Sequence, residues 1–273
     1  FGAQTDAARR FTESTLPNGM AFADNGDILV TNFGTDVLEV MTRSGETRIL
    51  YDTIDGKPIG KTNFVLRDSK NRIWITISTM SRNWMEALSP KVKDGYIALV
   101  DERGIRIVAD GFHFTNEIKL DANEEWLYIV ETCGKCISRM RVQADGSLTG
   151  YEVFGPSDLG VAGWPDGIAF DAYGNLWGTL VIADKIFAIT PDGDLRILLD
   201  DGDDTASAAL DAAFRADAVT PDHLFACGGT IAPWTASVTF GGADLKTVYV
   251  GSLRGTRIPY FRSPIAGLPL VHW

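Results

Sequence analysis

Four segments of the chain place an amide or carboxylate side chain directly ahead of an apolar, strand-like run. These side chains belong to Asn18, Asn63, Asn116 and Asp166, which we call the ring residues, and each follows Pro or Thr. Their oxygen atoms are the donors that Ca²⁺ and Mg²⁺ prefer, whereas zinc sites usually contain sulfur or imidazole. If the fold brought the four together, they could bind one divalent cation, with Asp166 as ligand and general base.

The same positions have a simpler explanation, because Asn and Asp often form the turns that precede strands. Their recurrence at one position in four segments favours a ring. Each segment continues as an alternating apolar run, a polar turn and a second apolar run, a pattern typical of a β-hairpin. A degenerate fifth copy begins at Ala236.

The spacing of these copies predicts the architecture. The copies begin 45, 53, 50 and about 70 residues apart, and further strand-like pieces give each unit about four strands. Such units, repeated every ~40–50 residues, indicate the blades of an all-β propeller. We expect residues 1–273 to form one propeller domain with five recognisable blades. Insertions are expected near 80–94 and at 201–217, the latter an Ala-rich helix capped by Asp204 or Thr205.

Composition narrows the choice of partners. The net charge of −11 argues against nucleic acid, whose binding usually needs a basic face. No apolar run approaches the roughly 20 residues of a membrane helix and no signal peptide is visible, so we expect no membrane partner and a cytoplasmic protein. Oligomeric state is open. Cys133 and Cys136 form a CGKC sequence, which we interpret as reduced thiols in a tight turn, with a local disulfide as the alternative.

The phrases PDGIAFDAYGNLW, SVTFGGADLKTVYVGS and IAGLPL resemble the SMP-30/gluconolactonase/luciferin-regenerating-enzyme family. The resemblance spans 17–273 and implies a six-bladed β-propeller that holds a divalent cation and hydrolyses a small lactone or sugar-acid-like ester. It implies that Asn63, Asn116 and Asp166 bind the cation and that Asp166 is the catalytic base. Ca²⁺ is the expected ion, with Mg²⁺, Mn²⁺ and Zn²⁺ as alternatives.

The chain departs from the family pattern in two places. The EGP motif that carries a glutamate ligand is absent, so we expect the first blade to be incomplete or missing. Lys61 stands where the family often has an arginine that contacts substrate, and lysine cannot form the bidentate contact of arginine.

Four residues are candidates for contact with the substrate: Asn18, Lys61, Glu117 and Trp164. The alternatives are a solvated strand end for Glu117 and ordinary packing for Trp164. His113 could carry a proton, although a lone histidine in a loop usually does not. Two other functions stay open, a non-hydrolytic enzyme that resembles strictosidine synthase and a ligand-binding propeller without catalysis.

Overall fold

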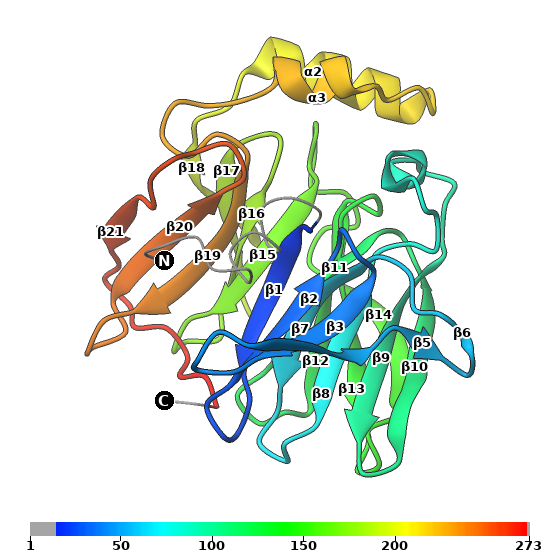
Figure 1. The fold of residues 1–273 in the computed structure, drawn as a ribbon. Coiled ribbons are helices and arrows are strands. Elements are labelled where there is room, and N and C mark those ends of the chain that lie inside the picture. Colours follow the sequence, from blue (N-terminus) through cyan, green and yellow to red (C-terminus); the bar gives the residue numbers. More distant parts are fainter. Residues whose placement is uncertain (1–14, 272–273) are drawn as a thin grey trace.

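The computed structural model describes residues 15–271, which contain five small antiparallel sheets arranged as the blades of a β-propeller (Figure 1). Blade 1 contains β1 (Pro17–Phe22), β2 (Ile28–Asn32), β3 (Val37–Met41) and β4 (Thr47–Tyr51). Blade 2 contains β7 (Thr62–Arg67), β8 (Ile73–Ile77), β9 (Gly95–Asp101) and β10 (Gly104–Phe112). Blade 3 contains β11 (Thr115–Leu120), β12 (Trp126–Glu131), β13 (Cys136–Val142) and β14 (Leu148–Phe154). Blade 4 contains β15 (Pro165–Phe170), β16 (Leu176–Leu180), β17 (Lys185–Ile189) and β18 (Leu195–Asp200).

Blade 5 has three strands, and a short hairpin follows blade 1. The strands of blade 5 are β19 (Thr235–Gly241), β20 (Thr247–Ser252) and β21 (Tyr260–Arg262), and the hairpin consists of β5 (Thr53–Ile54) and β6 (Lys57–Pro58). The first strand of each blade contacts the first strand of the next, in the order β1, β7, β11, β15 and β19. The predicted all-β propeller is therefore confirmed with five blades in the described part of the chain. That part contains no sixth blade, and blade 5 has one strand fewer than predicted.

Each of these inner strands is irregular where the ring residues lie. The pairing with the second strand shifts register between Pro17 and Met20, Thr62 and Val65, Thr115 and Ile118, Pro165 and Ile168, and Thr235 and Ser237. A bulge of this kind breaks the strict alternation of side chains and can redirect one of them. In the first four blades the ring residue and its successor therefore lie outside the regular ladder.

Two glycines follow ring residues because the inner strands approach closely there. A Cβ on Gly19 would lie 2.6 Å from the Cα of Phe64, and one on Gly167 would lie 2.5 Å from the Cα of Ser237. Gly167 does not have a positive φ. Its lack of a side chain permits the close contact between blades 4 and 5.

Helices lie in and beside the two predicted insertions. They are the short 3-10 helix η1 (Trp84–Ala87), α2 (Asp204–Arg215) and α3 (Pro221–Ala226), of which α3 was not expected. The N-cap of α2 is Asp203, one residue before the predicted cap, and its carboxylate accepts the N–H of Ala206 at 2.9 Å. Figure 1 shows α2 and α3 crossing one end of the propeller. None of the helices in residues 15–271 is long and apolar enough to span a bilayer.

A buried ion pair ties α2 to blade 3. Lys135 Nζ lies 2.7 Å from Asp211 Oδ1 on α2, and both side chains are at least nine-tenths buried. Lys135 belongs to the CGKC turn, in which Cys133 and Cys136 are buried and free, as the reduced-thiol interpretation predicts. The CGKC turn therefore anchors the helical insertion to blade 3.

We expect Lys135→Ala to lower the free energy of unfolding by about 2–3 kcal/mol, because it leaves a buried carboxylate without its lysine partner. This loss is smaller than the ~3–5 kcal/mol typical of a broken buried ion pair, because Arg215 still pairs with Asp211 at 2.7 Å. Urea denaturation measures the change. In the control, Lys91→Ala breaks an exposed pair with Asp217 and should change stability by less than about 0.5 kcal/mol. Equal losses in the two variants would contradict this account of α2.

Candidate active site

The ring residues of blades 1 and 2 touch directly. Asn18 Nδ2 donates to Asn63 Oδ1 at 2.8 Å, and Asn63 Nδ2 donates to Ser78 Oγ at 2.9 Å. The Ser78 hydroxyl in turn donates to the carbonyl oxygen of Thr115 at 2.8 Å, which connects blade 2 to blade 3. Asn63 is buried and Asn18 is exposed, so the amide pair extends from the interior to the surface.

The ring residues of blades 3 and 4 form a second pair. The Asn116 side chain is close enough to Asp166 to lower the pKa of its carboxyl group, and its Nδ2 donates to Thr132 Oγ1 at 3.0 Å. The Thr132 hydroxyl donates to the carbonyl oxygen of Pro165 at 2.8 Å. The four ring residues thus lie on successive neighbouring inner strands, each at the bulge of its strand.

Threonines hold the bulges that carry three of the ring residues. In blades 1, 2 and 4 the N–H after the ring residue donates to a threonine of the second strand. These bonds run from Gly19 to Thr31 at 3.0 Å, from Phe64 to Thr76 at 2.9 Å and from Gly167 to Thr179 at 3.2 Å. These threonines were not predicted from the sequence. The signal was present, since threonine is the fourth residue of the second strand in ILVT, IWIT and LWGT.

Two carboxyl groups meet near the Asn116 end of the site. Burial raises the pKa of Asp166 well above its usual value, the charge of Glu117 raises it further, and the Asn116 hydrogen bond lowers it. Burial also raises the pKa of Glu117, an effect that Lys119 partly opposes, with Nζ 3.7 Å from Glu117 Oε2. In the described part of the chain, no lysine or arginine forms an ion pair with Asp166.

This donor set fits a hard divalent cation. It offers amide oxygens and a half-buried carboxyl group without a cationic partner, and it contains no sulfur or imidazole. No group of three or more His, Cys, Asp or Glu side chains within residues 15–271 is arranged to hold a metal. A cation at this position would therefore depend on the amides of Asn63 and Asn116 together with Asp166.

Lys61 lies beside an aromatic cluster at the start of β7. Its Nζ is 2.9 Å from Asp36 Oδ1 and 5.7 Å from the centre of the Phe33 ring, and the residue is 7% exposed. Phe33 also contacts Trp84 and Phe114, with ring centres 6.2 and 6.5 Å apart. The lysine charge is thus already paired, and the half-buried Phe33 and Trp84 offer apolar surface beside it.

Trp164 lies beneath α2. It is 2% exposed, and Phe214 of α2 packs edge-on against it with ring centres 5.3 Å apart. A substrate would reach this indole only if α2 moved. The position of α2 above Trp164 places the insertion next to Asp166, two residues further along the chain.

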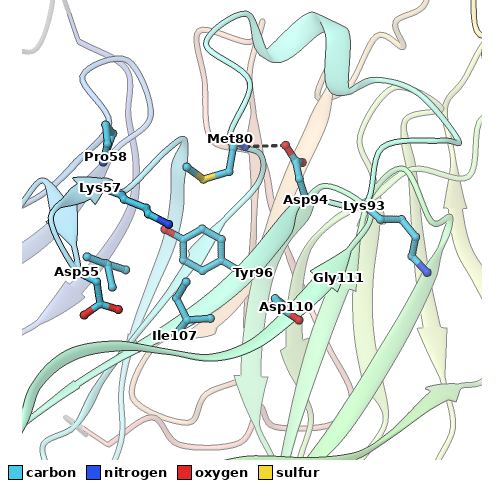
Figure 2. A pocket seen from close by; sticks show the side chains of 11 residues that line it. Asp55, Lys57, Pro58, Met80, Lys93, Asp94, Tyr96, Ile107, Asp110 and Gly111 are labelled. Atoms are coloured by element: carbon cyan, nitrogen blue, oxygen red, sulfur yellow. Dashed lines mark hydrogen bonds between the residues drawn. The ribbon is translucent and has the colours of Figure 1, made fainter.

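Two pockets lie apart from the ring residues. His113 lines one of about 340 Å³ with Cys133 and Cys136, and its Nδ1 is 2.8 Å from the carbonyl oxygen of Val92. The other, of about 540 Å³, lies between the β5–β6 hairpin and blade 2 (Figure 2). There Asp94 accepts the N–H of Met80 at 2.9 Å. No ring residue lines either pocket.

Comparison with known proteins places this geometry in a family context. The family model described as the SMP-30/Gluconolactonase/LRE-like region matches residues 3–202. A 6-deoxy-6-sulfogluconolactonase of Pseudomonas putida is 24% identical over 211 residues, which are 76% of this chain and 60% of that protein. The chain thus spans 60% of the length of this relative, less than two thirds.

Two solved structures share the fold. A gluconolactonase from Xanthomonas campestris has a TM-score of 0.62 and 18% identity, over 86% of this chain and 69% of its own. A calcium-binding protein named regucalcin, from Agrobacterium tumefaciens, has a TM-score of 0.53 and 16% identity, over 93% of this chain and 91% of its own. At such identities these structures support the propeller fold alone.

Proposed function

Because the chain belongs to the SMP-30/gluconolactonase/LRE-like family, we propose that it is a cation-dependent hydrolase of a small lactone, with Asp166 as the general base. Lactone hydrolysis agrees at a coarse level with the names of its relatives. The observation that carries the proposal is the position of Asn63, Asn116 and Asp166 at the bulges of three successive neighbouring inner strands, β7, β11 and β15.

The ring residues have two proposed roles, cation binding and proton transfer. Asn63, Asn116 and Asp166 would hold the cation through their side-chain oxygens. A bound divalent cation supplies Lewis acidity, which polarises a carbonyl oxygen and lowers the pKa of water. Asp166 accepts a proton from the attacking water as the general base. Addition of one water opens the lactone to a hydroxy acid.

The side chains around the ring residues favour an uncharged lactone substrate over a polyanionic one. Lys61 pairs with Asp36 and therefore has little free charge to offer an acidic substrate. Asn18 is exposed and donates its amide N–H to Asn63, so its carbonyl oxygen can accept a hydrogen bond from a substrate hydroxyl. Phe33 and Trp84 would contact the less polar face of the lactone.

A panel of sugar lactones and aliphatic lactones tests the proposed reaction. Proton release is followed while Ca²⁺, Mg²⁺, Mn²⁺ and Zn²⁺ are titrated separately into the protein. We expect hydrolysis of at least one lactone with saturable dependence on one of the ions. Cation binding without hydrolysis of any lactone would favour a binding propeller instead.

Asn63→Ala and Asn116→Ala are expected to weaken cation binding by about 10–100-fold, because each removes a ligand oxygen. Turnover at saturating cation should fall much less, since an amide supplies no basic group at neutral pH. Isothermal titration calorimetry with Ca²⁺ measures the affinity. Asn123→Ala, in an exposed turn of blade 3, is the matched control. Unchanged affinity in both ring variants would remove these amides from the cation site.

A further inference from the structure

The residue that follows each ring residue faces the inner strand of the next blade. In blades 1 and 4 this residue is glycine, and a Cβ there would lie within 2.6 Å of the backbone of Phe64 or Ser237. Blade 3 has Glu117 at the same position. Its side chain follows the same direction and reaches β15, the strand that carries Asp166.

Glu117 binds the backbone of β15 at the bulge. Its Oε2 accepts the peptide N–H of Ile168 at 2.9 Å, two residues beyond Asp166. The register of β15 with β16 shifts between Pro165 and Ile168, and this N–H is directed across the blade boundary rather than into β16. A side chain of blade 3 thus binds the irregular part of blade 4.

A lysine supports this carboxylate from the same strand. Lys119 Nζ lies 3.7 Å from Glu117 Oε2 and 4.5 Å from the centre of the Phe64 ring. The two charged side chains are only 17% and 15% exposed. The lysine charge offsets part of the cost of burying the carboxylate, and the contacts on both sides restrict its rotamers.

The two peptide N–H groups that follow Asp166 both donate to side-chain oxygens. Thr179 accepts the N–H of Gly167, and Glu117 accepts the N–H of Ile168. Together they hold both peptide N–H groups that follow Asp166.

We propose that Glu117 is a positioning residue that fixes the bulge of β15 through the Ile168 N–H and so directs the Asp166 carboxyl group toward Asn116. Its consequence for catalysis rests on the function proposed above. In this role Glu117 acts through the backbone of β15 and touches neither the cation nor the reacting atoms, whereas the sequence suggested contact with the substrate.

Two substitutions separate the hydrogen bond from the charge. Glu117→Gln keeps an acceptor oxygen at the same reach and removes the charge, whereas Glu117→Asp keeps the charge and falls one methylene short of Ile168. We expect Glu117→Asp to lower kcat at saturating cation and to weaken cation affinity, each by about 10–100-fold, with KM nearly unchanged. Glu117→Gln should retain both within about threefold. Glu125→Gln, at an exposed position of the same blade, is the control.

Hydrogen exchange of the Ile168 amide gives a readout that does not depend on activity. The amide should exchange faster in Glu117→Asp and at the wild-type rate in Glu117→Gln, with thermal melts showing that both variants fold. Wild-type exchange in Glu117→Asp, or equal losses of activity in the two variants, would overturn the positioning role. If the wild-type protein opens no lactone, the proposed function fails, while the exchange rates still support or overturn the bond to β15.

Discussion

Asp166→Asn is expected to lower the rate of lactone opening by about 10²–10⁴-fold at saturating cation, the usual contribution of a positioned general base. The substitution keeps the size of the side chain and one ligand oxygen, and it removes the charge and the basic oxygen. The loss should therefore appear in kcat rather than in the fold.

The comparison requires cation in excess, because Asp166 has two roles in this account. At limiting cation a weaker ligand and a missing base would both lower the rate, and only saturation separates them. Asp194→Asn, at an exposed position of the same blade, is the control and should keep the wild-type rate. Full activity of Asp166→Asn at saturating cation would contradict the assigned base.

Local sequence patterns predicted the features that depend on neighbouring residues in the chain, namely the hairpins, the blade repeat and the inserted helix. Alternating apolar residues and polar turns predict hairpins, and their repetition predicted the blades that contain β1, β7, β11 and β15. The level of the ring residues followed from the same repeat, because equivalent positions on inner strands converge in a propeller. The Ala-rich composition likewise predicted α2, with its cap displaced by one residue to Asp203.

The sequence did not predict features that depend on contacts between blades. The ion pair of Lys61 with Asp36 joins loops whose spacing carries no sequence signal. The burial of Trp164 depends on where α2 docks, which Lys135 and Asp211 determine across 76 residues of chain. No pattern in the sequence predicts that Gly167 closely approaches Ser237 on the neighbouring inner strand.

Removal of divalent cations is the second change with a large expected effect. Chelation should lower lactone turnover by about 100-fold or more, because several kcal/mol of charge stabilisation would be lost and each 1.4 kcal/mol is about tenfold in rate. The site offers little to replace the cation. The two lysines nearest to the ring residues in sequence are already paired. Lys61 pairs with Asp36, and Lys119 pairs with Glu117.

The rate of lactone hydrolysis by the wild-type protein, measured after chelation and again after addition of excess Ca²⁺, Mg²⁺ or Mn²⁺, tests the central claim most directly. The account predicts that the chelated protein is nearly inactive and that one of these ions restores full turnover, which the Asp166→Asn variant does not regain. A chelated protein that opens the lactone at the undiminished rate would contradict it.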